Sequence, residues 1–370
     1  MRIVITGADG FIGRNLALRL GELGYLEIVP ITLESTRADL LAALSGAGFV
    51  FHLAGVNRPK DVTEFATGNT GVTEELCDAL VEVDCAAPVV LSSSTQAALD
   101  NPYGLSKRAA EDALLQYGAR TATLVYLFRL TNVFGKWAQP NYNSAVATFC
   151  HNIARGLDIS INDPSAALRL VYVDDVVSAF VELLAEPRRA GGFVEAGPEY
   201  ETTVGEVAQT LRGFAGSRAS MLTDRVGSGL VRALYSTYLS YLLPESFAYA
   251  VPRHTDPRGE FVEMLKTLDC GQFSYFTAPP GITRGEHYHH SKAEKFLVIR
   301  GTARFGFRQV VTGERHDLVV KGGEARIVET VPGWTHNVTN IGDDEMIVML
   351  WANEIFDPRR PDTFAMKVNP

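Results

Sequence analysis

The chain has 370 residues and a formal net charge of −9, and 46% of its residues are hydrophobic. This length favours two domains, and the acidic balance argues against a nucleic-acid partner. No apolar run approaches the roughly 18 residues of a membrane span. The N-terminus also lacks a secretory pattern and the four cysteines form no CxxC pair, so we expect a cytoplasmic protein with no membrane partner.

Short apolar runs alternate with segments of helical periodicity through the first part of the chain. The apolar runs predict strands at 2–7, 27–32, 49–55, 88–94 and 122–130. The periodic segments predict helices at 14–24, 36–48, 69–85, 106–119, 144–156, 174–186, 203–216 and 229–243. Strands that alternate with helices predict a parallel sheet covered on both faces, in a Rossmann-like α/β domain.

The pattern changes after residue 252, where short alternating runs replace the helical periodicity. Strands are predicted at 261–267, 272–278, 294–301, 302–310, 324–331, 336–342 and 345–353. Many short strands separated by turn residues predict an all-β sandwich or barrel. We therefore expect an α/β domain at 1–243, a linker at 244–256 and an all-β domain at 257–370.

A GxxGxxG pattern fills the turn between the first predicted strand and the first helix. Glycine keeps such a turn tight and lets the backbone approach a pyrophosphate at the helix N-terminus, so a dinucleotide is the expected ligand. A purely structural turn is the alternative, because the motif is short. The expected cofactor contacts in this segment are Gly7, Gly10, Phe11, Ile12, Gly13 and Arg14.

The segment NPYGLSK puts Tyr103 and Lys107 four residues apart, on one face of a helix. A nearby ammonium lowers the pKa of a phenol, so the tyrosine could exchange a proton with a carbonyl or an alcohol. Ser94 ends the preceding strand and could hold the reacting oxygen, and Ser92 and Ser93 are adjacent alternatives. A Tyr and a Lys that merely share an exposed helix face are the competing interpretation.

The motifs TGADGFIG, HLAG, SSS, YGLSK, FRLTNVFG and VYVDDVV together resemble the extended short-chain dehydrogenase/reductase family over about residues 1–240. The resemblance implies a reductase that acts on nucleotide-linked sugars. It implies that Tyr103 is the catalytic acid, that Lys107 binds the nicotinamide ribose and that Ser94 orients the substrate carbonyl. The other implied contacts are Ala54 for the cofactor and Asn132 and Arg169 for the substrate.

The choice between NADPH and NADH depends on the end of the second predicted strand. No acidic residue closes this strand, where an Asp or Glu would bind a ribose 2′-hydroxyl. Arg14 and Arg37 are nearby and could pair with a 2′-phosphate, which favours NADPH. Glu34 could fill the acidic role instead and keeps NADH open.

The C-terminal region contains a group of residues that suits a metal ion. His287 and His289 are two apart, so on a strand they point to one face. Glu294 follows, and His336 comes later. Three imidazoles and a carboxylate suit Zn, Fe, Mn or Ni, and we expect one divalent ion, with Zn in first place. His290 could replace His289 as a ligand or serve as a free acid-base group.

The segments around these residues resemble the two signatures of the cupin family, over about residues 257–370. This resemblance implies a jelly-roll barrel with a metal inside. A metal used only for stability, or a site with a purely binding role, is the alternative. We also expect a homodimer through this domain, because jelly rolls often pair their edge strands across a two-fold axis.

A reductase of this kind joined to a cupin resembles the bifunctional enzymes of capsular polysaccharide synthesis. The resemblance implies a UDP-linked amino sugar, UDP-2-acetamido-2,6-dideoxy-hexos-4-ulose, as the substrate. The cupin would epimerise C3, with Tyr288 and His290 as candidates for the base. The reductase would then reduce the C4 ketone with NADPH to UDP-N-acetyl-6-deoxy-L-talosamine, on the route to N-acetyl-L-fucosamine.

Two other hypotheses remain open. The chain could be a single-activity reductase whose cupin is a metal-stabilised dimerisation module. It could also be a nucleotide-sugar binding or sensing protein without catalysis, although the intact Tyr-Lys pair counts against this.

Overall fold

In the computed structural model, which describes residues 1–187 and 190–370, the first-half strands form a six-stranded parallel sheet. Its order is β2-β1-β3-β4-β5-β8. The central strands are almost entirely buried, as parallel strands covered on both faces should be. The strands are β1 (Arg2–Thr6), β2 (Ile28–Ile31), β3 (Ala47–His52), β4 (Val89–Ser94), β5 (Val125–Leu130) and β8 (Gly192–Phe193).

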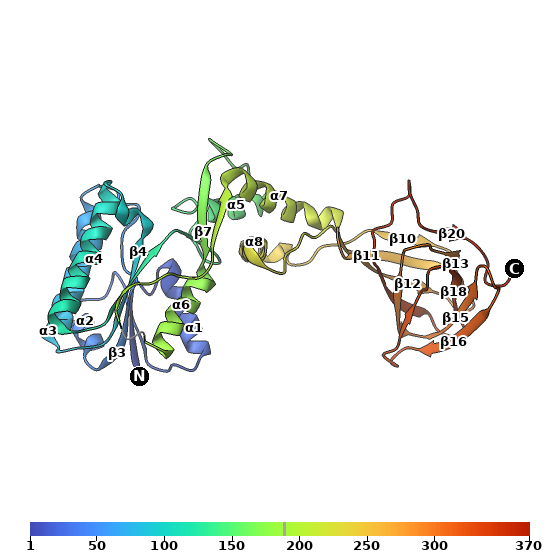
Figure 1. Cartoon of the computed structure of the whole chain (residues 1–370), viewed down its shortest axis with the longest axis horizontal. Helices are drawn as coiled ribbons and strands as arrows, with labels where there is room; N and C mark the ends of the chain where they lie inside the picture. Colours follow the sequence, from blue (N-terminus) through green and yellow to red (C-terminus); the bar gives the residue numbers. More distant parts are fainter. Residues whose placement is uncertain (188–189) are drawn as a thin grey trace. The chain divides into compact units, whose positions relative to one another are not determined.

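Helices cover both faces of this sheet, which confirms the expected α/β arrangement (Figure 1). On one face lie α2 (Arg37–Leu44), α3 (Val72–Glu82) and α4 (Pro102–Thr121), and on the other lie α1 (Phe11–Glu22) and α6 (Val173–Ala185). Helix α4 starts four residues before the predicted start. The Asn101 side chain accepts a hydrogen bond from the Gly104 N–H at 2.8 Å, and proline suits the first helical position.

A small sheet with the order β6-β7-β9 also forms in this part of the chain. The apolar pattern does not predict it, because β9 has the polar sequence EYETT and no buried residue. None of the helices in the described ranges is both long and apolar enough to cross a membrane. The remaining elements here are β6 (Asn132–Phe134), β7 (Ala167–Tyr172), β9 (Glu199–Thr203), α5 (Ala145–Ile153), α7 (Val204–Ser220), α8 (Gly229–Ser240), η1 (Ala66–Gly71), η2 (Thr95–Ala98) and η3 (Pro244–Ser246).

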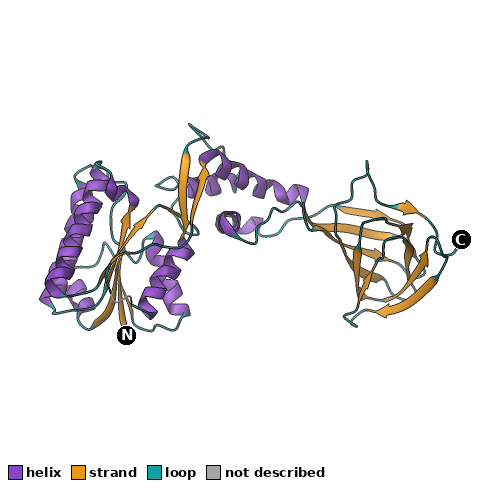
Figure 2. Cartoon of the chain, in the orientation of Figure 1, coloured by secondary structure: helices purple, strands orange, loops and turns teal. Residues whose placement is uncertain are grey.

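From residue 253 onward the chain consists of strands and loops, which confirms the expected all-β region (Figure 2). Two antiparallel sheets form, with the orders β10-β11-β12-β19-β14-β17 and β16-β15-β18-β13-β20. The first contains β10 (Arg253–Asp256), β11 (Gly259–Thr267), β12 (Gly271–Ala278), β14 (Glu294–Arg300), β17 (Ile327–Glu329) and β19 (Met346–Ala352). The second contains β13 (Thr283–Tyr288), β15 (Thr302–Gln309), β16 (Arg315–Lys321), β18 (Trp334–Asn340) and β20 (Phe364–Ala365).

Side chains from both β-sheets meet in one hydrophobic core. Phe276 and Phe296 come from the first sheet, and Phe305 and Val338 come from the second. The ring centres of Phe296 and Phe305 are 5.7 Å apart. Apolar inner faces with polar outer faces are the ordinary arrangement of a two-sheet sandwich.

The chain divides into two compact units. The first unit consists of Met1–Arg212 with Gly229–Leu243, and the second consists of Gly213–Ser228 with Pro244–Pro370. The predicted boundaries therefore differ in the segment 213–228, which groups with the all-β region. Backbone pairing explains this, because the Thr223 N–H donates to Lys266 O at 2.8 Å and the Lys266 N–H donates to Met221 O at 2.7 Å.

Candidate functional sites

The glycine turn after β1 packs closely against the segment that follows β3. Gly7 has a φ of +67°, and a Cβ there would lie 2.8 Å from the Ala54 backbone nitrogen. A Cβ on Gly13 would lie 2.2 Å from Gly7 O, so only glycine fits there. Gly10, at the N-cap of α1, forms no side-chain cap. The free N–H groups of the first helical turn and the close backbone approach suit a bound pyrophosphate.

The structure brings Ser94, Tyr103 and Lys107 together at the carboxyl end of β4. Burial raises the pKa of Tyr103, and a hydrogen bond with Ser94 acts in the opposite direction. Burial lowers the pKa of Lys107 to about 8, against the influence of Glu111. The Lys107 ammonium donates to the Ser92 carbonyl at 3.2 Å. The expected lowering of the Tyr103 pKa by Lys107 is therefore not what burial and hydrogen bonding produce here.

The three serines of the SSS motif have different partners. Ser94 is the one hydrogen-bonded to Tyr103. The Ser93 hydroxyl instead donates to the buried carboxylate of Glu111 at 2.5 Å, and Arg129 binds the same carboxylate through two nitrogens. Between the Ser93 and Ser94 hydroxyls, the geometry thus favours Ser94 as the one that could meet a substrate.

Asn69 is a buried residue of this region that the motifs do not predict. Its side-chain amide accepts from the Val56 N–H at 3.0 Å and donates to Val56 O at 2.9 Å and to the Ser106 hydroxyl at 3.0 Å. A Cβ on Gly55 would lie 2.7 Å from Asn69 Oδ1 and 3.0 Å from Lys107 Nζ. Asn69 therefore fixes the segment after β3 against the helix that carries Tyr103. Its only sequence signal is a polar residue inside a helical pattern.

The two arginines expected near a cofactor phosphate have protein partners. Arg14 donates to the Trp137 carbonyl at 3.4 Å. Arg37 pairs with Glu82 at 2.7 Å and with Glu75 at 3.8 Å. A 2′-phosphate would have to compete with two carboxylates for Arg37. The structure therefore gives little support to Arg37 as a contact of the NADPH 2′-phosphate.

Asn132 and Arg169 lie on neighbouring strands of the small sheet. The Asn132 amide donates to the Arg169 carbonyl at 3.0 Å. The exposed Arg169 guanidinium forms an ion pair with Glu199. The structure thus brings these two residues together, and their side chains lie on β6 and β7 rather than on the main sheet.

The four predicted metal ligands of the second unit converge. Potential ligand atoms of His287, His289, Glu294 and His336 all lie within 4.8 Å of one another. Glu294 Oε2 is 3.3 Å from His289 Nε2 and 3.4 Å from His336 Nε2. Among the described residues, neither buried ring nitrogen of His336 forms a hydrogen bond of good geometry, and Nε2 has only the 3.4 Å approach of Glu294 Oε2. Such unpaired nitrogens are costly unless something else binds them, so the group fits a metal ion.

The charge states of this cluster also suit a cation. Burial lowers the pKa of His287 to about 4, and His336 acts in the same direction. Burial raises the pKa of Glu294, but its neighbours His289, His336 and Lys292 outweigh burial and hold it well below its usual range. A neutral His287 imidazole and an ionised Glu294 carboxylate are the forms in which these two residues ligate a metal. Lys292, buried and 3.2 Å from Glu294 Oε1, is a further residue that the motifs do not predict.

His289 and His290 have different surroundings. His289 is 1% exposed and lies in the cluster. His290 is exposed, and its ring packs against Tyr288 and Phe364 with ring centres 5.5 and 4.8 Å away. The geometry therefore favours His289 as a ligand. Tyr288 stacks on Phe364 at 5.3 Å, so neither proposed base belongs to the cluster.

The cluster borders a cavity of about 220 Å³. His287, Glu294 and His336 line it together with aromatic side chains from both sheets. A cavity beside the cluster leaves room for a small ligand. Fully closed coordination is the usual sign of a structural metal site, and an open side is the usual sign of a catalytic one.

Two family profiles match the chain. The profile of the NAD dependent epimerase/dehydratase family matches residues 3–197. The profile of the polysaccharide biosynthesis C-terminal domain matches residues 254–364. The two matches fall in the α/β part and in the all-β part of the chain, respectively.

Full-length relatives also match. A Pseudomonas aeruginosa protein named UDP-2-acetamido-2,6-beta-L-arabino-hexul-4-ose reductase is 56% identical over 368 residues, which cover 100% of this chain and 99% of that protein. The crystal structure of the capsular polysaccharide assembling protein CapF from Staphylococcus aureus has a TM-score of 0.93 at 41% identity, covering 100% of both chains. UDP-glucuronic acid 4-epimerase from Bacillus cereus, solved with NAD, shares the fold alone, with a TM-score of 0.56, 19% identity and coverage of 65% of this chain and 98% of its own.

Proposed function

The chain belongs to the family of CapF-like capsular polysaccharide proteins, and we propose that it catalyses two consecutive steps on one UDP-linked 4-keto sugar. The second unit epimerises C3, and the first unit reduces the C4 ketone. The name of the Pseudomonas relative supports the reduction. The observation that carries the two-step proposal is the cavity beside His287, Glu294 and His336, which a sealed structural metal site would not need.

The proposed substrate is UDP-2-acetamido-2,6-dideoxy-hexos-4-ulose, and the proposed product is UDP-N-acetyl-6-deoxy-L-talosamine, a precursor of N-acetyl-L-fucosamine. NADPH held at the glycine turn would supply a hydride to C4. Tyr103 gives its phenolic proton to O4 in the same step, and its raised pKa keeps that proton bound at neutral pH. Ser94 holds O4 through its hydroxyl. Lys107 binds the nicotinamide ribose and stabilises the phenolate, which then regains a proton from solvent.

The epimerisation must come first, for a chemical reason. The C4 ketone acidifies the C3–H bond, so a base can remove this proton and an acid can return one to the opposite face of the enolate. Once C4 is an alcohol, that acidity is lost. A divalent cation held by the His–Glu cluster would supply positive charge close to the oxygen that becomes negative. Reduction then traps the epimerised ketone.

Three finer features belong to this proposal. The second unit is a jelly-roll cupin, which the two antiparallel sheets and their shared core support. Its metal is zinc, which is one of the ions that three imidazoles and a carboxylate suit. The protein is a homodimer through this unit, because β10 and β17 are the edges of one sheet and edge strands can pair with another chain. Light scattering and metal analysis of the purified protein test the last two features.

One experiment tests both steps. The 4-keto sugar nucleotide is incubated with the metal-loaded protein in deuterated water, with and without NADPH. Deuterium at C3 without NADPH, followed by a deuterated alcohol when NADPH is added, is the expected result. Tyr103→Phe should exchange C3 normally but fail to oxidise NADPH, and His336→Ala should lose the exchange.

The single-activity hypothesis makes a different forecast. If the wild-type protein reduces the ketone without any exchange at C3, the second unit is a stability module and the two-step proposal is wrong. Unchanged NADPH oxidation by Tyr103→Phe would instead remove Tyr103 from its role as the acid. The binding-protein hypothesis requires that neither reaction occurs.

A further inference from the structure

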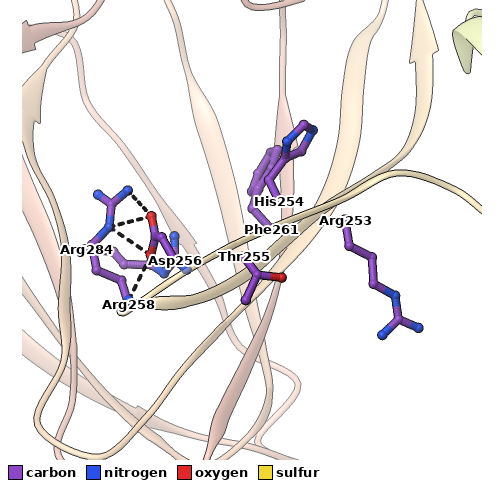
Figure 3. A pocket seen from close by; sticks show the side chains of 7 residues that line it. All are labelled: Arg253, His254, Thr255, Asp256, Arg258, Phe261 and Arg284. Atoms are coloured by element: carbon purple, nitrogen blue, oxygen red, sulfur yellow. Dashed lines mark hydrogen bonds and ion pairs between the residues drawn. The ribbon is translucent and has the colours of Figure 1, made fainter.

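A basic pocket of about 550 Å³ lies in the second unit, beside the hairpin of β10 and β11 (Figure 3). Three arginines and one aspartate are its fully charged residues. This excess of positive charge stands out in a chain whose net charge is −9. The pocket is lined by Arg253, His254, Thr255, Asp256, Arg258, Phe261 and Arg284.

Arg284 forms no ion pair with a carboxylate among the described residues, although the nearby Asp256 carboxylate acts to raise its pKa. Its guanidinium donates to the carbonyls of Thr277 and Glu260, at 3.1 and 3.5 Å. Asp256 is already bound by Arg258 through two nitrogens, at 3.0 and 2.5 Å. Burial lowers the pKa of Arg284, and the neighbouring Arg258 acts in the same direction. Two guanidinium groups held near each other repel, and an anion between them relieves that repulsion.

Among the described residues, Arg253 has one ion-pair partner, and that pair is long. Its guanidinium is 3.7 Å from the Glu260 carboxylate and is largely exposed. Figure 3 shows the Arg253 side chain extending away from Arg258 and Arg284, which lie near Asp256. Arg253 therefore stands at the rim of the pocket, and Arg258 and Arg284 are its inner arginines.

The basic pocket adjoins the cavity beside the metal cluster. Arg258, Phe261 and Arg284 line both of them. A ligand held by the arginines would thus have its next group at the entrance to a cavity that contains His287 and Glu294. That cavity, at about 220 Å³, is smaller than the roughly 300–1,000 Å³ sites of drug-sized ligands. A single sugar ring suits this size.

We propose that Arg258 and Arg284, with Arg253 at the rim, bind the diphosphate of a nucleotide sugar and direct its hexose into the metal-lined cavity. This inference rests on the proposed function and names the substrate contacts of its first step. Arginine is suited to the task, because its planar fork matches two phosphate oxygens at once. The diphosphate of a nucleotide sugar carries one negative charge on each phosphate. Arg258 and Arg284 outnumber Asp256 by one charge, and Arg253, which is shared with Glu260, adds to it at the rim. The chain would then have two sites for the same nucleotide, one in each unit.

Counting bound UDP tests the proposal directly. Equilibrium dialysis of the full-length, metal-loaded protein with UDP should give two sites per chain. Arg258→Gln and Arg284→Gln should each lose one site, or weaken it by about tenfold or more. Arg304→Gln is the matched control, because Arg304 is exposed on β15 and forms no ion pair among the described residues. This variant removes one charge from the same unit and should retain both sites.

The outcomes decide the proposal without depending on catalysis. Equal UDP binding by wild type, Arg258→Gln and Arg284→Gln overturns it, whether the wild type has one site or two. Arg258 lies on an exposed turn, so its variant keeps the test valid if Arg284→Gln fails to fold. Where the wild type also exchanges the C3 proton, both variants should raise the KM for exchange about tenfold or more, and Arg304→Gln should not. A wild type that binds two UDP but exchanges nothing contradicts the epimerase step and leaves the pocket supported.

Discussion

Glu294 and His336 come from different sheets of the second unit, yet Glu294 Oε2 and His336 Nε2 are 3.4 Å apart. His287, from the same sheet as His336, is its direct cross-strand partner. A cation bound here would connect the two sheets at their core. Binding such an ion is therefore coupled to the stability of the sandwich.

The first prediction separates the two adjacent histidines. His289→Ala removes a buried member of the cluster, whereas His290→Ala removes an exposed ring. We expect metal affinity to fall by more than about tenfold in the first variant and to stay at the wild-type level in the second. Metal analysis after dialysis against a graded chelator measures this. The reverse order of the two variants would contradict the assignment of His289.

The second prediction concerns the glycine turn. In Gly13→Ala the new methyl would lie 2.2 Å from Gly7 O, so the turn must move and its N–H groups no longer meet a pyrophosphate. We expect the affinity for the nicotinamide cofactor to fall by at least about tenfold. A titration that monitors the fluorescence of the reduced cofactor measures this affinity.

Gly21→Ala is the control for this substitution, because Gly21 lies on the same helix and a Cβ there has no neighbour within 4 Å. It should leave cofactor binding unchanged and stabilise the protein by up to about 1 kcal/mol in urea unfolding. Normal cofactor binding by Gly13→Ala would show that this turn does not hold the phosphates.

The third prediction is a pH dependence. Burial lowers the pKa of Lys107 to about 8, so its ammonium is present below that pH and is lost as the pH rises through it. The pKa of Tyr103 is raised, so the phenol stays protonated over the same range. We expect kcat/KM for the nicotinamide cofactor to decline above about pH 8. In Lys107→Arg the charge persists, and the remaining activity should show no such decline. If kcat/KM declined above about pH 8 in the same way in both proteins, a group other than Lys107 would cause the decline.

The fourth prediction tests how much the buried carboxylate of Glu111, which binds Ser93 of the SSS motif, contributes to stability. Glu111 is 2% exposed and binds both the Ser93 hydroxyl and the Arg129 guanidinium. Glu111→Gln keeps the shape but removes the charge, and we expect a loss of about 2 kcal/mol in the free energy of unfolding. Arg108→Gln, which breaks an exposed ion pair with Asp100, should cost less than about 0.5 kcal/mol. If both variants lost a similar free energy of unfolding, the burial of Glu111 would not explain its contribution to stability.

The helices and the first five strands of the main sheet in the first unit were predictable because their signals are local, whereas the small sheet β6-β7-β9 was not. The glycine turn and the Tyr103–Lys107 spacing each fall within a few residues of the chain. Asn69 and Glu111 were not predictable, because their roles arise from burial against segments that are distant in sequence. The ion-pair partners of Arg37 could not be predicted from the sequence either, since Glu75 and Glu82 belong to another helix.

The second unit shows a different limit. Alternation along a strand assigns His287 and His289 to one face only while the strand continues. Strand β13 ends at Tyr288, so His289 and His290 lie beyond it, where alternation no longer assigns a face. The exact end of a strand cannot be located from the sequence, so the choice between His289 and His290 required the structure. The basic pocket likewise depends on a turn and a strand more than twenty residues apart.

Because the segment 213–228 belongs to the second unit, one cut in the chain does not separate the two units. The chain passes between the units at three points, after Arg212, Ser228 and Leu243. A single cut between Leu243 and Pro244 would leave Met221 and Thr223 bonded to Lys266 through the backbone, so the fragments would stay associated. Conversely, a fragment that begins at Pro244 would lack those partners. The second unit is therefore not a simple C-terminal addition. It includes residues 213–228, which lie in the sequence between the two segments of the first unit.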